Sequence, residues 1–344
     1  MERKAALKKI FLAFGFFILL VLIVFVLSRG KIYPQNELSY GVTFSEKQAT
    51  DLGLDWKQTY SAILDDLGVK KLRLSAYWDE VEPERGDFEW QDLDWQIDQA
   101  SSRKAQVILA LGGRLPRWPE CHWPGWAGQL DEAARGKEIL TYIEQGIDRY
   151  KNNPTIVAWQ IENEPFLSHF GECPSLDKNF LDQEIALARR LDPRPIVITD
   201  SGELSIWIPA ASRADIFGTT MYRDTYSKVL GRYIHYPIGP SFFRFKKNIA
   251  SFFAHPKKWV VIELQAEPWG PISYQDMTEA ERDRTMDLQK FKAILAFARE
   301  AGFREFYLWG AEWWYWEKQT QHNPALWAEA KTLFNSKTTI SNSQ

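Results

Sequence analysis

The stretch with the clearest chemical potential is Asn163-Glu164-Pro165, which follows the short apolar run at residues 155–159. That run is rich in β-branched and aromatic residues, so it predicts a buried strand. A carboxylate at the end of such a strand is costly unless it is paired, hydrogen-bonded or used in chemistry. We therefore predict that Glu164 is a catalytic acid; the alternative is a solvated loop carboxylate.

A second carboxylate, Glu263, has the same setting, because it directly follows the apolar run at residues 259–262. In one barrel, the two carboxylates would face each other across the mouth. Glycoside hydrolysis uses such a pair, one group protonated and the other ionised, and burial with mutual repulsion separates their pKa values. Glu267 is the rival for the second role. Glu162 is predicted to share the side of Glu164 as a hydrogen-bonded or salt-bridged neighbour.

The elements that position these residues alternate between strand and helix from residue 39 onward. Strands are predicted at residues 40–44, 71–75, 106–111, 155–159, 195–199, 215–221, 259–262 and 304–309. Helices are predicted at residues 55–67, 93–103, 132–150, 176–191, 242–253, 278–301 and 324–334. This alternation predicts a (β/α)8 TIM barrel. A doubly wound sheet is the runner-up, but no Gly-x-Gly-x-x-Gly turn follows the first strand.

Unusual residues gather where the predicted strands end, which is the reactive face of such a barrel. They occupy residues 77–80, 114–118, 163–164, 220–223, 263–269 and 309–314. Aromatic rings among them suit sugars, whose C–H faces stack on rings. Trp309 is the preferred platform, and Trp118, Trp123, Trp269 and Trp313 are weaker candidates. His122 is either structural or substrate-facing.

At this point the sequence resembles the clan A glycoside hydrolases, and family 5, the cellulase-like enzymes, in particular. The resemblance covers about residues 38–335. It is carried by Asn163-Glu164-Pro165, by Trp259-Val260-Val261-Ile262-Glu263, by Arg73, by the stretch from Trp78 to Phe88, and by Tyr222 and Trp309. The histidine pair often found after strands three and six of that family is missing, which leaves the sugar open.

The resemblance implies a retaining β-glycoside hydrolase without a metal or an organic cofactor. Glu263 would be the nucleophile and Glu164 the acid/base. The implied substrate-binding residues are Arg73, Trp78, Asn163, Tyr222 and Trp309, with Asn163 on the sugar 2-hydroxyl and Arg73 and Tyr222 orienting Glu263. From their position after the Glu263 strand, Glu267 and Trp269 are further substrate-binding candidates. Two alternatives remain: a non-catalytic glycan-binding barrel, and a transglycosylase that uses the same residues.

The two cysteines, Cys121 and Cys173, fall in the loops after strands three and four. Adjacent strands bring these loops to the same face, so we predict a disulfide that braces the rim; two free thiols are the alternative. A zinc site would need further ligands at suitable spacing, so no metal is predicted.

The N-terminus differs from the rest of the chain. The formal net charge is -3, yet residues 1–31 are strongly basic. The remainder is therefore acidic, which argues against nucleic acid as a partner. Residues 10–27 are uncharged and apolar and are just long enough to span a bilayer.

The flanking charges predict an orientation for that span. We expect a cytoplasmic N-terminus at residues 1–9, an uncleaved transmembrane signal anchor at 10–28, a linker at 29–38, an extracytoplasmic barrel at 39–335 and a flexible tail at 336–344. A cleaved signal peptide is the alternative, but no suitable cleavage site follows the apolar run.

Overall fold

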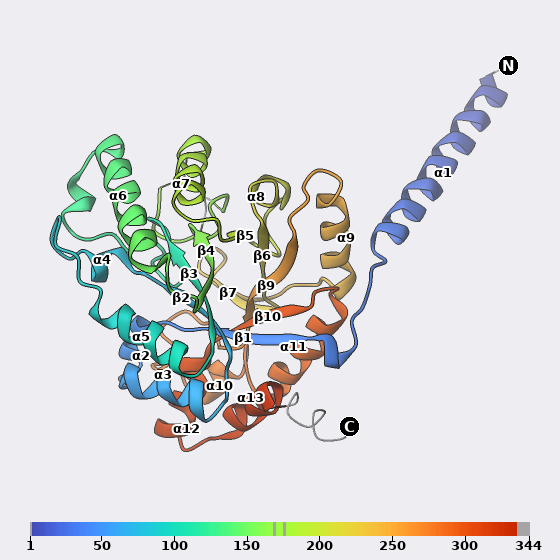
Figure 1. The fold of residues 1–344 in the computed structure, drawn as a ribbon. Helices are drawn as coiled ribbons and strands as arrows, with labels where there is room; N and C mark the ends of the chain where they lie inside the picture. Colours follow the sequence, from blue (N-terminus) through green and yellow to red (C-terminus); the bar gives the residue numbers. More distant parts are fainter. Residues whose placement is uncertain (1, 168–169, 175–176, 336–344) are drawn as a thin grey trace, which may run out of the picture.

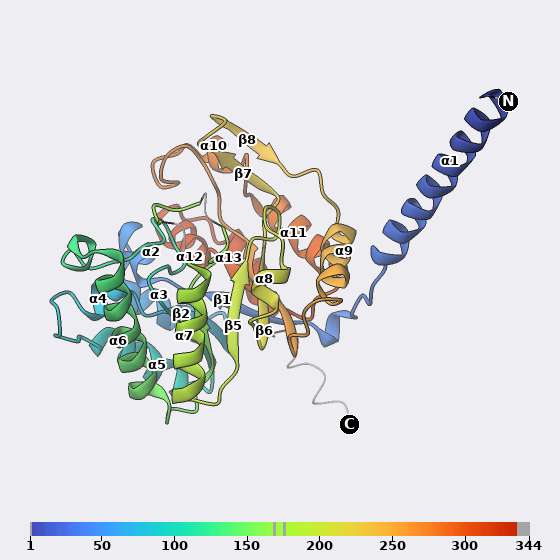
Figure 2. The ribbon, with the colours of Figure 1, turned by 90° about the horizontal axis from the view of Figure 1, so that it is seen from above.

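The structure is a computed structural model that describes residues 2–167, 170–174 and 177–335, with side chains described from residue 13 onward except at residue 20. The predicted tail at 336–344 lies outside the described residues. Figures 1 and 2 show a barrel surrounded by helices, with one long helix that projects from it.

Eight parallel strands close into a barrel in the order β1-β10-β9-β6-β5-β4-β3-β2. The strands are β1 (Ser39–Thr43), β2 (Lys71–Ser75), β3 (Gln106–Leu111), β4 (Ile156–Ile161), β5 (Ile196–Asp200), β6 (Ile216–Met221), β9 (Lys258–Gln265) and β10 (Glu305–Trp309). Strand β1 pairs with both β2 and β10, which closes the ring. The (β/α)8 prediction is therefore confirmed.

With one exception, the predicted helices begin and end within a few residues of the predicted bounds. They are α3 (Trp56–Asp65), α5 (Gln91–Ser102), α6 (Glu132–Tyr150), α7 (Lys178–Leu191), α9 (Pro240–Ala250), α11 (Leu288–Glu300) and α13 (Ala325–Asn335). Several begin at an aspartate whose side chain accepts a backbone N–H of the first turn, as Asp55 and Asp131 do. These caps satisfy N–H groups that have no partner within the helix.

The prediction of one helix over residues 278–301 is wrong in part. The structure has α10 (Glu279–Arg282) and α11, separated by a short break. The break occurs because the Asp287 side chain accepts the Lys290 N–H and so caps a new helix.

Several short elements are absent from the sequence predictions. They are α2 (Glu46–Asp51), α4 (Trp78–Val81), α8 (Ile208–Ala211), α12 (Ala311–Thr320), two 3-10 turns (Gln35–Glu37 and Ala127–Gln129) and the hairpin of β7 (Asp224–Ser227) and β8 (Arg232–His235). Helix α12 matters most, because it follows β10 at the reactive face.

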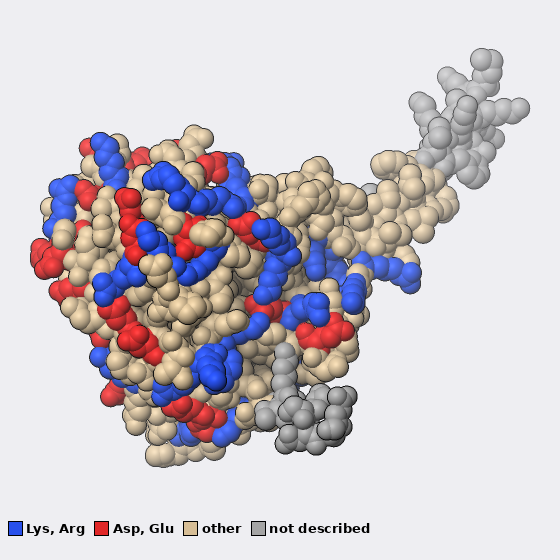
Figure 3. Space-filling view, in the orientation of Figure 1, with Lys and Arg blue, Asp and Glu red and all other residues tan. Residues whose placement is uncertain are grey.

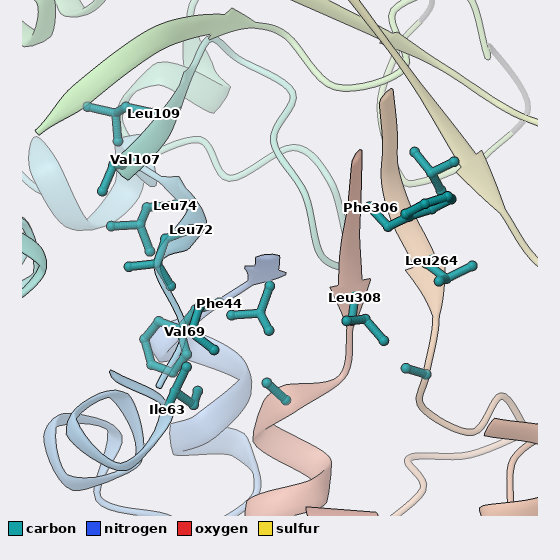
Figure 4. Close-up of a cluster of buried hydrophobic side chains, with 14 of the residues drawn as sticks. Phe44, Ile63, Val69, Leu72, Leu74, Val107, Leu109, Leu264, Phe306 and Leu308 are labelled. Carbon is teal, nitrogen blue, oxygen red and sulfur yellow. The ribbon is translucent and has the colours of Figure 1, made fainter. Parts of the chain in front are cut away.

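The core has two layers because side chains alternate along each strand. The outer layer lies between strands and helices; in the part drawn in Figure 4, Leu72 and Leu74 of β2 lie beside Val107 and Leu109 of β3. The inner layer fills the barrel with Ile108, Ala158, Val197, Val260, Ile262 and Tyr307. Arg73 lies between Leu72 and Leu74, so its side chain belongs to the inner side.

The N-terminal helix α1 (Glu2–Leu27) extends away from the barrel (Figures 1 and 2). Its last turn is held by α9, where Asn248 Nδ2 donates to Leu27 O at 2.8 Å and Arg244 Nε donates to Ser28 O at 2.9 Å. Among the described residues, no helix has the length and apolarity needed to cross a bilayer. The predicted anchor at residues 10–28 therefore gains no support from the structure.

The surface of the barrel carries both signs of charge. On the face drawn in Figure 3, lysine and arginine side chains alternate with aspartate and glutamate, whereas the described part of α1 is uncharged up to the linker.

Candidate active site

Glu263 lies near the C-terminal end of β9, and only 4% of it is exposed. Arg73 Nη1 donates to its Oε1 at 2.6 Å, and the Tyr222 hydroxyl donates to its Oε2 at 3.0 Å. Burial and the charge of Glu263 raise the pKa of Tyr222 well above its ordinary value, so this hydroxyl keeps its proton. Both carboxylate oxygens are thus held in a fixed orientation by charged or polar donors.

Arg73 ties three strands together beneath the barrel mouth. Besides Glu263, it donates from Nε to Gln160 Oε1 at 2.8 Å and from Nη2 to Asn163 Oδ1 at 2.7 Å. The guanidinium is fully buried, so each of these charge-assisted bonds is shielded from water. Arg73 therefore sets the positions of Glu263 and Asn163 relative to each other.

Glu164 follows Asn163 at the end of β4 and has a left-handed backbone with φ of 42°. Its N–H donates to Thr199 Oγ1 at 2.8 Å, and its side-chain Oε1 has no hydrogen-bond partner among the described residues. Burial, and then the charges of Glu263 and Glu120, raise the pKa of Glu164 well above its ordinary value. A buried carboxyl of this kind holds a proton that it can donate.

Glu162 does not share the side of Glu164, contrary to the two-residue alternation expected of a strand. Its φ of 58° breaks the extended backbone. Its two oxygens accept the N–H groups of Gly113 at 2.7 Å and Arg114 at 2.6 Å. The buried Glu184 of α7 lies beside it, and burial with the charge of Glu162 raises the pKa of Glu184 well above its ordinary value.

A third carboxyl group, Glu120, joins the site from the β3–α6 loop. Its Oε2 accepts both Arg114 Nε and Asn163 Nδ2, each at 3.1 Å. Burial raises the pKa of Glu120 to about 7; the charge of Arg114 acts against this and that of Glu263 adds to it. Nothing in the loop sequence indicates that Glu120 turns inward, so its place in the site is not predictable from the sequence.

A second cluster surrounds the buried Arg117, which donates to Glu267 Oε1 and, at 3.1 Å, to Glu312 Oε2. Trp309 also donates its Nε1 to Glu267 Oε1, at 2.7 Å, and the Arg117 guanidinium stacks on the Trp309 ring at 4.1 Å. Glu267 is thus committed to Arg117 and Trp309. The charge of Glu263 helps to raise the pKa of Glu164, so these two carboxyl groups lie close enough to interact. The geometry therefore favours Glu263 over Glu267 as the partner of Glu164.

A row of aromatic rings leads outward from Tyr222. Trp269 lies 5.3 Å from the Tyr222 ring, Phe170 lies 5.9 Å from Trp269, and Trp118 lies 6.0 Å from Phe170. Trp118 is half exposed, and Lys228 of the β7–β8 turn lies over its ring at 4.3 Å. This row offers apolar ring surface of the type that sugars stack on.

The structure corrects the expected sugar-binding role of Trp78. Its side chain is fully buried, donates to Glu82 at 2.7 Å and packs against Trp126 and Tyr142. The indole has no free face, so its role is in packing.

Among the weaker platform candidates, Trp123 donates to Gly113 O, and Trp313 is buried beside Tyr274. His122 is also buried, and burial lowers its pKa to about 4, so it is a neutral residue of the wall.

The loops after β3 and β4 are linked at the rim. Cys121 and Cys173, the pair expected to form a disulfide, are joined by one across 52 positions of sequence. Glu172 N also donates to Pro119 O at 2.9 Å. The loop that carries Glu120 is therefore fixed to the loop that follows Glu164.

One cavity of about 360 Å³ is lined by Arg282, Trp316 and Glu317 beside α10 and α12, and contains none of the catalytic candidates. We place the active site at the mouth because the carboxylates, arginines and rings converge there. Within residues 2–335 as described, no group of three or more His, Cys, Asp or Glu side chains could hold a metal ion.

Comparison with known proteins points to the same chemistry from the sequence side. The profile of the family Glyco_hydro_42, described as beta-galactosidase, matches residues 55–191. Beta-galactosidase BgaA of Clostridium cellulovorans is 22% identical over 165 residues, which cover 42% of this chain and 25% of that protein. Endo-1,4-beta-xylanase 3 of Hypocrea jecorina is 28% identical over 120 residues, 34% of this chain and 33% of that one. The chain thus matches a quarter to a third of the length of these curated relatives.

Solved structures share the barrel. A glycosylated endo-beta-1,4-xylanase of glycoside hydrolase family 10 from Gloeophyllum trabeum matches with a TM-score of 0.57 at 15% identity, covering 86% of this chain and 96% of that chain. A cold-adapted beta-galactosidase from Rahnella sp. R3 matches with a TM-score of 0.57 at 13% identity, covering 88% of this chain and 56% of that chain. At these identities the likeness establishes the fold alone. The comparisons support the expected resemblance to the clan A glycoside hydrolase barrels, but they give no support to family 5 in particular.

Proposed function

We propose that this chain is a retaining β-glycoside hydrolase, with Glu263 as nucleophile and Glu164 as acid/base. The observation that carries the proposal is the contrast between the two carboxyl groups. Glu263 has both oxygens held as acceptors by Arg73 and Tyr222, whereas Glu164 is buried, raised in pKa and has an oxygen without a partner. One group is prepared as a carboxylate and the other as an acid, as glycoside cleavage requires.

In the first step, a Glu263 oxygen attacks the anomeric carbon while the bond to the leaving oxygen breaks. The Glu164 proton passes to that oxygen, which departs as an alcohol. Arg73 and Tyr222 fix the direction of attack, and Asn163, held by Arg73, is placed to bind the sugar 2-hydroxyl.

In the second step, Glu164 is ionised and takes a proton from a water molecule. The water oxygen bonds to the anomeric carbon, and the bond to Glu263 breaks. Two inversions return the sugar with its original configuration.

The substrate class that we propose is a neutral β-linked sugar, with β-galactosides and β-1,4-xylans as the first candidates. The names of the relatives motivate these two. The row from Tyr222 to Trp118 would stack units beyond the cleaved bond.

The test uses Glu164→Gln and Glu263→Gln in the full chain, assayed on 4-nitrophenyl β-galactoside and β-xyloside and on xylan. Each variant should lose on the order of 10²-fold or more in kcat/KM, because it removes a proton donor or a nucleophile. Circular dichroism checks that the fold is intact.

Azide should restore turnover to Glu263→Gly and give a glycosyl azide of inverted configuration, and proton NMR of the wild-type product should show retention. Wild-type kcat/KM in both Gln variants would refute the assignment, and azide rescue of Glu267→Gly in place of Glu263→Gly would move the nucleophile to Glu267.

The location of the barrel is a separate proposal from the sequence: α1 attaches it to a membrane, with the barrel outside the cytoplasm. Its support is the exposed apolar side chains at residues 14–19 and 21–26 and the basic residues around them in the sequence. Membrane fractionation of the full chain tests it; full recovery in the carbonate-soluble fraction would refute it.

A further inference from the structure

Glu120 is a buried carboxyl group that the proposed mechanism does not use. It is 4% exposed and has a left-handed backbone with φ of 75°. Its Oε2 accepts bonds from two donors, Arg114 Nε and Asn163 Nδ2. Burying a charge and straining the backbone are both costly, so they point to a role at the site.

The bond to Asn163 determines which way its amide faces. Asn163 Oδ1 already accepts Arg73 Nη2 at 2.7 Å and Thr199 Oγ1 at 3.2 Å. One N–H of Nδ2 is taken by Glu120, which leaves the other N–H for an outside acceptor. With the oxygen and one hydrogen both engaged, the amide cannot flip.

The backbone around Glu120 is held from several sides. Arg114 is fixed by Leu167 O and Phe170 O at 2.9 and 2.7 Å, in addition to Glu120. The neighbouring residue Cys121 is in the disulfide with Cys173. Gly171, with φ of 80°, packs so closely that a Cβ there would lie 2.9 Å from Glu120 Cγ.

We propose that Glu120 is a positioning residue that holds the Asn163 amide so that its free N–H meets the sugar 2-hydroxyl. The proposal rests on the function proposed above, and it adds Glu120 and Arg114 to the machinery around the glycone. Glu120 acts on the sugar through Asn163. Its charge also helps to raise the pKa of Glu164, and that effect is the same for every sugar.

The kinetic test compares 4-nitrophenyl β-D-galactoside with its 2-deoxy analogue, using the full chain and the variants Glu120→Gln, Asn163→Ser and the double variant. Glu120→Gln keeps the shape and removes the charge. We expect it to lower kcat/KM on the parent sugar by up to about 100-fold. On the 2-deoxy sugar, which lacks the hydroxyl that the amide would bind, the loss should be much smaller, because only the effect on Glu164 remains.

In the double variant, the losses should not add, because both changes act on one contact. Equal losses on the two sugars, or additive losses in the double variant, would overturn the proposal. Glu172→Gln is the matched control: it removes the same charge from an exposed residue beside Cys173, and it should match the wild type.

A second readout needs no turnover. In protein labelled with ¹⁵N-asparagine, the side-chain amide signal of Asn163, assigned by its absence in Asn163→Ser, should move in Glu120→Gln and stay in place in Glu172→Gln. An unmoved signal in Glu120→Gln would overturn the proposal. If the wild type and Glu164→Gln are equally inactive on every sugar, the proposed function fails, while this signal still decides whether Glu120 holds the amide.

Discussion

The charged side chains at the barrel mouth are buried and almost wholly committed to one another. Arg73 donates hydrogen bonds to three side chains, Arg114 donates to Glu120 and two carbonyl groups, and Arg117 donates to two carboxylates. Buried ion pairs of this kind add little net stability, because desolvation offsets the attraction. Their value lies in fixed geometry for the groups that they hold.

Arg73→Lys should separate charge from geometry. Lysine keeps the positive charge, but its single ammonium cannot reach Gln160, Glu263 and Asn163 in the directions that the planar guanidinium provides. We expect kcat/KM to fall by on the order of 10²-fold. Arg85→Lys, at an exposed residue, is the control; equal rates in the Arg73→Lys variant and the wild type would show that charge alone is enough.

Buried carboxyl groups predict a pH dependence of stability. Burial raises the pKa of Glu184 well above 4.5, so above that pH the folded chain binds more protons than the unfolded chain. The free energy of unfolding should then fall as pH rises above about 4.5, by up to about 1.4 kcal/mol per pH unit for each such proton.

Glu184→Gln removes that proton while keeping a donor for Glu162. Its unfolding free energy, measured by urea denaturation from pH 5 to pH 8, should decline less steeply than that of the wild type. Asp98→Asn, at an exposed position of α5, should leave the wild-type slope unchanged. An identical slope in Glu184→Gln would place the proton elsewhere.

At the scale of residues, sequence reasoning reaches only the side chains fixed by the strand pattern. Glu164, Glu263 and Tyr222 lie where an apolar run meets a polar turn, so their convergence is predictable. Arg73 lies within the strand β2, and only the family resemblance indicates it. Glu120 depends on a left-handed backbone within a loop, for which the sequence has no marker.

The elements divide in the same way. Helices such as α6 carry an aspartate cap and an apolar stripe, and their predicted bounds agree with the structure. Helix α12 lacks such a stripe, because the residues from Ala311 to Glu317 are all buried, so it has no polar face to mark a helix. The helix starts after Gly310, whose φ of 123° is a backbone conformation that glycine adopts easily. Any other residue there would place its Cβ 2.5 Å from Glu267 Cβ.

The disulfide between the β3–α6 and β4–α7 loops should stabilise both loops and the catalytic rim. Replacing Cys121 and Cys173 by serine removes the crosslink between positions 52 residues apart, so the unfolded chain gains conformational entropy. The free energy of unfolding should fall by about 2–4 kcal/mol. Denaturant titration of the oxidised wild type, the reduced wild type and the double variant measures this. The reduced wild type should match the double variant, and a loss confined to one of them would point to a cause other than the crosslink.

At the scale of the whole molecule, a closed barrel of strands surrounded by helices carries the N-terminal helix α1 on its outside. In the part of α1 that the structure describes, a hydrogen bond from Asn248 Nδ2 to Leu27 O ties the helix to the barrel, whereas β1 pairs with two strands. The contribution of the two segments to stability should therefore differ sharply.

Deletion of residues 1–27 should lower the free energy of unfolding by about 1 kcal/mol or less, the value of one hydrogen bond. Deletion of residues 1–43 removes β1, exposes the edges of β2 and β10, and should abolish cooperative unfolding. Calorimetry distinguishes the two outcomes, and a large loss in the shorter deletion would show that α1 packs on the barrel more extensively than at its last turn.

The pairing of β1 with β10 also makes the starting point of the chain arbitrary. Asn335, at the end of α13, lies against Gly68 in the turn before β2, at the end of the barrel where the strands begin. A short linker from residue 335 to residue 38 would act as one more helix-to-strand turn. New termini could then be opened at the turn around Gly302, away from the catalytic rim. A circularly permuted chain of this kind would retain every contact around Glu164 and Glu263, because those contacts depend on the order of strands around the ring and not on the order of synthesis.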